Sequence, residues 1–261
     1  MNYLRLYQKY LAIQIQSMMQ YKASLLMTTV GQFLVSFNVF LGVYFMFQRF
    51  HQVEGFTYSE VLLCYAVTLM EFSLAETFAR GFDMFSVTIS NGEFDRILVR
   101  PRNEIFQVLA SRIELTRIGR MLQAVVMFLY GIAKSDVHWS FDKILTVVFM
   151  LIGGTLVFSG IFLLYATVCF FTLEGLEFMN VFTDGAREYG KYPISVYGKR
   201  MLMFCTFVVP YSLIQYYPIC YILEKNSRPW YPLLPLSAGL FLIPCYCLWR
   251  LGVRHYQSTG S

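Results

Sequence analysis

The chain has 261 residues, of which 57% are apolar and only 14% are charged, and its mean hydropathy is +0.51. A soluble domain carries roughly a quarter of charged residues, so this composition excludes an ordinary water-soluble protein. Several stretches exceed the ~18 apolar residues that indicate a membrane-spanning helix. We therefore predict an all-α polytopic membrane protein that forms a single transmembrane domain over residues 1–261.

Residues 1–22 are amphipathic, with apolar side chains at steps of three and four and polar side chains mostly between them. This spacing predicts a helix that lies in the membrane interface, with a flexible tail as the alternative. The first long apolar run, residues 23–47, exceeds the core of roughly 7 to 15 residues found in a cleavable signal, so we predict that it is the first span.

Six spans are predicted, which places both termini on the same side. The third is short, so Arg117 and Arg120 are expected to snorkel towards the headgroups. The fourth is long enough to bend near Gly153 and Gly154, and Pro210 interrupts the fifth, as a gating kink or as an ordinary membrane proline. The predicted spans are residues 23–47, 59–78, 117–133, 144–172, 201–223 and 233–253.

Basic residues are divided unevenly between the two sides of the predicted membrane. Sixteen Lys and Arg lie on the side of the termini and of the loops 80–120 and 173–200, and five lie on the other side. By the positive-inside rule, both termini and both long loops are cytoplasmic. The same rule accounts for the net charge of +5, so we expect no nucleic-acid partner.

Two acidic residues lie inside the second span. At 1.5 Å per residue from Ser59, Glu71 is about 18 Å along the helix and past mid-membrane. An acid at that depth costs roughly 2.5 kcal/mol or more unless it is paired or hydrated. Glu71 therefore either lines a substrate pathway that favours cations or makes a structural contact between helices. For Glu76, near the cytoplasmic interface, we expect the structural contact.

The sequence contains no clear motif for catalysis, nucleotide binding or metal binding. Residues 185–192 nearly spell a phosphate-binding loop, but Tyr192 stands where Ser or Thr would hold magnesium, and no strand precedes the loop. His51, His138 and His255 are far apart in the predicted topology, and none of the six Cys forms a C-x-x-C pair. We expect no catalytic or metal site, and any ATPase must be another polypeptide.

Three segments carry a family resemblance: residues 92–101 (Gly-Glu-Phe-Asp-Arg-Ile-Leu-Val-Arg-Pro), 184–197 and 256–261. Together they resemble the membrane subunits of type-2 ABC exporters, in the small six-span branch of multidrug or viologen exporters. The resemblance covers the whole chain. It implies a dimer with a second copy or a paralogue in the bacterial cytoplasmic membrane, in contact with lipid. It also implies that this subunit binds no cofactor directly, and that ATP and magnesium bind to separate cytoplasmic ATPase subunits.

The resemblance also implies that the loop between the second and third spans holds a coupling helix that fits a groove on the ATPase. Pro101 can open a helix, and the basic side chains offer charge to a partner or, as the alternative, to lipid headgroups alone. The implied coupling residues are Gly92, Glu93, Phe94, Asp95, Arg96, Arg100, Pro101 and Arg102. A second cytoplasmic contact is implied at Arg187, Glu188, Tyr192 and Pro193.

The function implied is the permease subunit of an ATP-driven exporter of small amphipathic or cationic substrates. Its pathway would lie between subunits, with Gln32, Asn38, Glu71 and Pro210 as candidate lining residues. A secondary, ion-coupled transporter is the alternative, but such folds usually show internal repeats, and we find none in the sequence. A membrane-embedded enzyme would require a set of catalytic residues that come together in one site, and we find no such set in the sequence.

Overall fold

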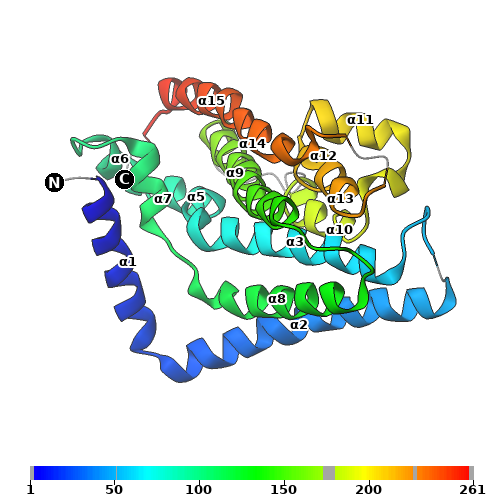
Figure 1. The fold of residues 1–261 in the computed structure, drawn as a ribbon. Coiled ribbons are helices and arrows are strands. Elements are labelled where there is room, and N and C mark those ends of the chain that lie inside the picture. The colour runs from blue at the N-terminus through cyan, green and yellow to red at the C-terminus, as the bar shows by residue number, and fades with distance from the viewer. Residues whose placement is uncertain (1–2, 51, 173–179, 226–227, 259–261) are drawn as a thin grey trace.

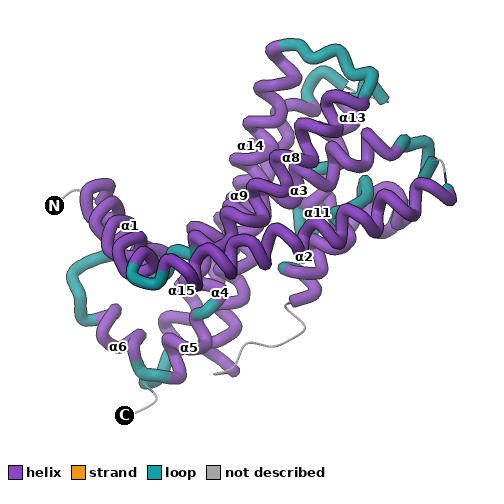
Figure 2. The backbone as a smooth tube through the Cα atoms, turned by 90° about the horizontal axis from the view of Figure 1, so that it is seen from below, coloured by secondary structure: helices purple, strands orange, loops and turns teal. Residues whose placement is uncertain are grey.

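The computed structural model describes residues 3–50, 52–172, 180–225 and 228–258. Within these ranges the chain is built from helices and connecting loops, and its only β geometry is an isolated bridge between Val53 and Phe56 (Figure 2). The predicted all-α class is confirmed. The long helices are α1 (Tyr3–Met19), α2 (Lys22–Arg49), α3 (Tyr58–Phe78), α8 (Ile118–Lys134), α9 (Phe141–Thr172) and α15 (Leu242–His255).

Shorter helices connect the long ones. Between α3 and α8 lie α4 (Arg80–Asp83), α5 (Phe85–Ser90), α6 (Glu93–Leu98), α7 (Glu104–Ser111) and the 3₁₀ turn η1 (Leu115–Arg117). Between α9 and α15 lie α10 (Asp184–Tyr189), η3 (Ile194–Tyr197), α11 (Lys199–Phe207), α12 (Tyr211–Ile214), α13 (Tyr216–Ile222), η4 (Tyr231–Leu233), α14 (Leu234–Ala238) and η5 (Gly239–Phe241).

Among the described residues, five helical stretches are long and apolar enough to cross a membrane. They match the predicted first, second, third, fourth and sixth spans to within a few residues. Helix α3 has apolar side chains around its circumference and is buried along most of its length against α8 and α9, with Glu71 and Glu76 among its buried residues. The five stretches are Lys22–Arg49, Tyr58–Phe78, Leu115–Lys134, Phe141–Thr172 and Tyr231–His255.

The predicted fifth span is broken. Helix α11 and the stretch Tyr211–Ile222 are bent by 89° relative to each other, so they form either one broken span or a re-entrant hairpin. The break contains Pro210, which has no backbone N–H to continue a helix, and the amide of Tyr211 turns back to the carbonyl of Val209. The interruption predicted at Pro210 within residues 201–223 is therefore present, and it is a sharp bend.

The two ends of the long helices differ in architecture. Figure 1 shows α1, α6 and α7 gathered at the end where both termini lie, whereas the connection between α2 and α3 lies at the opposite end. Helix α1 turns away from α2 and packs on α7. The ring centroids of Tyr3 and Phe106 are 5.0 Å apart, and the Gln14 amide donates to the Ser111 carbonyl at 2.8 Å.

Candidate functional site

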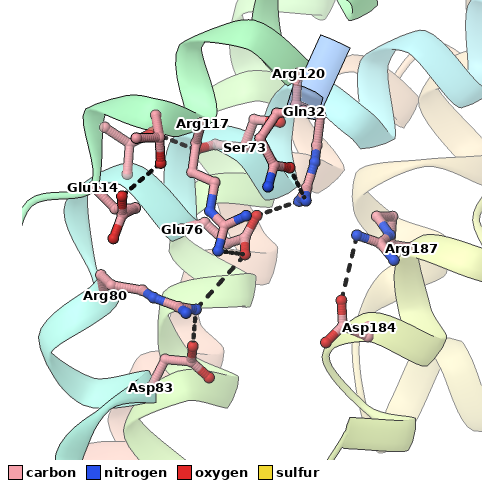
Figure 3. A network of polar contacts seen from close by, with 12 residues as sticks. Gln32, Ser73, Glu76, Arg80, Asp83, Glu114, Arg117, Arg120, Asp184 and Arg187 are labelled. Carbon is pink, nitrogen blue, oxygen red and sulfur yellow. Dashed lines mark hydrogen bonds and ion pairs between the residues drawn. The ribbon is translucent and has the colours of Figure 1, made fainter. Parts of the chain in front are cut away.

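A buried ion-pair cluster centred on Glu76 joins the long helices to the short ones. Three guanidinium groups point at its carboxylate from different elements (Figure 3): Arg120 on α8 donates to it, and Arg117 and Arg80 lie at 3.4 and 3.7 Å. The second nitrogen of Arg120 donates to Gln32 of α2 at 2.9 Å. Arg120 is only 6% exposed.

This arrangement confirms the interhelical contact predicted for Glu76, but it corrects the prediction for Arg117 and Arg120. Both side chains turn inward to the Glu76 carboxylate instead of snorkelling. Arg80 and Arg120 are also the two ends of the polar segment between the second and third spans. The whole segment therefore leaves and re-enters the membrane domain at one ionic junction.

The junction continues along α4. Arg80 also pairs with Asp83, and burial raises the pKa of the Asp83 carboxyl while the Arg80 guanidinium opposes that shift. A backbone hydrogen bond of 3.1 Å from Glu114 to Thr77 closes the segment onto the end of α3. The end of α3 and the start of η1 are thus held together by both backbone and side-chain contacts.

Beyond the junction, helices α5, α6 and α7 form a platform with an aromatic interior. Phe94, predicted as a coupling residue, is fully buried and packs edge to face on Phe85 and Phe170, each at 5.2 Å between ring centroids. Trp249 of α15 completes the cluster. In this structure Phe94 therefore supports the platform from inside and presents no surface to a partner.

The exposed face of the platform carries other predicted coupling residues. Val99 is 83% exposed, and Arg100 and Pro101 beside it are exposed too. Arg96 and Arg100 line a surface depression of about 200 Å³ that includes Tyr10 of α1. Exposed basic and apolar groups on a packed support form a surface to which a second protein can dock.

Local signals explain where two of the platform's helices, α6 and α7, begin. Gly92 adopts φ +65°, a left-handed conformation that favours glycine, and α6 starts at Glu93 directly after it. The prediction that Pro101 opens the next helix was wrong. Helix α7 starts at Glu104, and the side chain of Asn103 caps it by accepting a hydrogen bond from the Phe106 amide at 3.1 Å.

The end of the chain also reaches the platform, which sequence reasoning missed. The Ser258 hydroxyl donates to Asp95 at 2.6 Å. Arg250 of α15 donates to Glu104 of α7 at 3.2 Å. Residues 259–261, the end of the third resembling segment, lie outside the described residues.

The segment predicted as a second cytoplasmic contact runs along α3 towards its opposite end. The Arg187 guanidinium lies 5.5 Å from the Phe72 ring centroid, level with the Glu76 junction. Tyr192, however, donates to the Met46 sulfur at 3.2 Å, near the far end of α2. The buried Pro193 follows directly after it.

A shared contact with a partner on the α6–α7 platform therefore does not fit Tyr192 and Pro193. Of the four residues, Arg187 and Glu188 are nearest to the platform end. Residues 185–189 of the stretch that resembles a phosphate loop are helical here, and the turn that follows is closed by the Gly190 amide, which donates to the Ala186 carbonyl at 2.8 Å, and by the ion pair of Lys191 with Glu188. That geometry does not cradle a phosphate.

The candidate pathway residues are dispersed. Gln32 is engaged by Arg120, and Asn38 is exposed on α2. Pro210 is buried at the break after α11, and Glu71 is fully buried on α3. The structure does not bring these four residues together within one subunit.

Comparison with known protein families gives one match. A family model described as "ABC-2 family transporter protein" matches residues 33–260, which is most of the chain. The chain belongs to this ABC-2 transporter family. It is a multi-pass membrane permease, as the family and the apolar helices together indicate. Searches of curated proteins and of solved structures gave no match.

Proposed function

We propose that this permease is the membrane subunit of an ATP-driven exporter, with a separate ATPase docked on the exposed face of the α6–α7 platform. The observation that carries the proposal is the connection of that face to the Glu76 junction. Force applied at Arg96 and Arg100 passes through a packed aromatic interior to the end of α3, the most buried helix. A push on the platform would thus reach the membrane domain.

The proposed complex contains two permease subunits, identical or paralogous, in a bacterial cytoplasmic membrane with the platform on the cytoplasmic side. The apolar face of α2 supports a dimer or lipid contact, because Leu34, Val35 and Phe45 are exposed on it. ATP and magnesium would bind to the ATPase. The substrates would be small amphipathic or cationic molecules that pass between the subunits.

Native mass spectrometry of the tagged permease, purified in mild detergent with the candidate ATPase, tests this proposal. We expect a complex of two permeases and two ATPases. Charge reversal of Arg96 and Arg100 together should reduce the co-purified ATPase by at least about tenfold, equivalent to roughly 1.4 kcal/mol. Arg228→Glu, at the opposite end of the molecule, serves as the matched control.

Undiminished co-purification of the Arg96 and Arg100 variant would exclude these side chains from the interface. Failure to recover an ATPase with wild-type permease, even after crosslinking, would contradict the proposal as a whole.

A further inference from the structure

Helix α3 carries two buried glutamates that differ completely in their surroundings. Glu76 is surrounded by three guanidinium groups. Glu71, five residues earlier, is 0% exposed, and neither of its carboxyl oxygens has a hydrogen-bond partner. Among the described residues, no Lys, Arg or His pairs with Glu71 within ion-pair distance. The two acids therefore cannot be in equivalent chemical states.

The Glu71 side chain faces a cavity of about 10 Å³, which is close to the room needed by one water molecule. Gln215 also lines this cavity, and its amide nitrogen already donates to the Gly190 and Tyr192 carbonyls at 2.7 and 3.2 Å and to the Thr68 hydroxyl at 3.4 Å. The amide oxygen of Gln215 has no partner. The cavity thus holds three unpartnered acceptor oxygens, two from Glu71 and one from Gln215.

Two glycines make room for this polar face of α3. A Cβ at Gly154 of α9 would overlap the Glu71 carboxyl group, and a Cβ at Gly190 would lie 2.7 Å from the Thr68 methyl group. Each glycine belongs to a different element packed against α3. The site is therefore a built feature of the interior, in which only small groups fit beside Glu71.

The neighbouring titratable groups do not donate a hydrogen bond to any of these three acceptor oxygens. Tyr189 donates its hydroxyl to the Val181 carbonyl at 3.3 Å, and Tyr211 donates to the Phe182 carbonyl. Cys64 lies about two turns away along α3. The Thr68 hydroxyl donates to the Cys64 carbonyl at 3.1 Å. Because the donors are committed elsewhere, the three acceptors need hydrogen from outside the chain.

We propose that Glu71 and Gln215 form a binding site for one proton and one water molecule, with the proton on the Glu71 carboxyl group. The protonated oxygen of Glu71 becomes a donor, and the water donates to the remaining acceptors, so each of the three oxygens gains a partner. An ionised carboxylate would be left buried and unpaired, at a cost of several kcal/mol. The cavity is too small for an organic substrate in this arrangement.

The site links protonation to the position of residues 184–197. If this segment and α12–α13 move away from α3, water reaches Glu71. The proton of the Glu71 carboxyl group can then pass to the water, which leaves Glu71 as a carboxylate. Closing the site again requires the uptake of one proton. This inference rests on the geometry around Glu71 and holds whether or not the ATPase proposal is correct.

Infrared spectroscopy of the purified permease in lipid nanodiscs at neutral pH tests the proposal. We expect a carbonyl band of a protonated carboxylic acid that shifts in D2O and is absent from Glu71→Gln. Glu54→Gln, which removes an exposed carboxylate in the loop between α2 and α3, is the matched control and should keep the band. In wild-type protein, ¹³C-labelled glutamate should move the band, which requires no variant to fold.

The absence of a protonated-acid band that responds to ¹³C-glutamate would overturn the proposal. A carboxylate band that changes when sodium replaces choline in the buffer would assign the site to an inorganic cation instead. Persistence of the band in Glu71→Gln would place the proton on another group.

Discussion

The rings of Phe94 and Tyr256 pack edge to face, with centroids 5.0 Å apart and planes at 89°. They belong to segments 162 positions apart in the chain, and each segment carries part of the family resemblance. Burial raises the pKa of the Tyr256 hydroxyl to about 12. The contact ties the end of α15 to the platform on which we propose the ATPase docks.

Tyr256→Ala should loosen the platform, because edge-to-face aromatic pairs contribute about 0.5–1.5 kcal/mol beyond the area that they bury. We expect a lower thermal unfolding midpoint and less co-purified ATPase. Tyr256→Phe keeps the ring and should resemble wild type in both measurements. Equal losses for the two variants would indicate that the ring contact does not support the platform.

Removal of the Glu76 carboxylate should destabilise the protein strongly. Glu76→Gln leaves the buried Arg120 guanidinium without its anion, and breaking a buried pair on one side costs about 3–5 kcal/mol. The double variant Glu76→Gln with Arg120→Gln should recover part of the loss, because no uncompensated charge then remains at that pair. Thermal unfolding midpoints of the four proteins form a double-mutant cycle.

The coupling energy in this cycle is expected at about 0.5–3 kcal/mol, the range for directly interacting side chains. Strictly additive effects would show that Glu76 and Arg120 act independently, which would contradict the ion pair drawn in Figure 3.

The sequence predicted those parts of the fold that depend on local composition. Five spans follow from long, predominantly apolar runs, since burial or lipid contact is the only stable environment for them. The break at Pro210 was visible as a proline, but its 89° bend was not, because the angle depends on the packing of α11 against its neighbours.

The sites were harder to predict because their partners are distant in sequence. Glu76 and Arg80 stand four residues apart, a spacing that signals a helical ion pair. Arg120 and Gln32 carry no such signal, since each is 44 positions from Glu76. The same holds for Gln215 beside Gly190 and Thr68, where only the folded structure places a buried amide next to α3.

Gly154→Ala should destabilise the protein by about 1–3 kcal/mol, because overpacking a tight interior forces side chains out of position. The added methyl group would overlap the Glu71 carboxyl group. Combining Gly154→Ala with Glu71→Ala removes the overlap and should restore part of the unfolding midpoint. Gly42→Ala is a suitable control, since nothing lies within 4 Å of its added methyl group. Equal effects at the two glycines would contradict the packing described here.

An ion pair at the end of the molecule opposite to the platform, between Lys143 and Glu224, should make the stability of the protein depend on pH. Lys143 is buried and donates to Glu224 at 2.6 Å, and this hydrogen bond lowers the pKa of the Glu224 carboxyl. A lowered pKa in the folded state stabilises the protein above the ordinary glutamate value of roughly 4.3. The stabilisation is lost as pH falls through the lowered value.

We therefore expect the unfolding midpoint of Glu224→Gln to lie below that of wild type at neutral pH and to approach it on acidification. Glu54→Gln, an exposed residue in the loop between α2 and α3, provides the control and should follow wild type throughout. A gap between Glu224→Gln and wild type that stayed constant down to strongly acidic pH would exclude the Glu224 carboxylate as its source, because that carboxylate is protonated there.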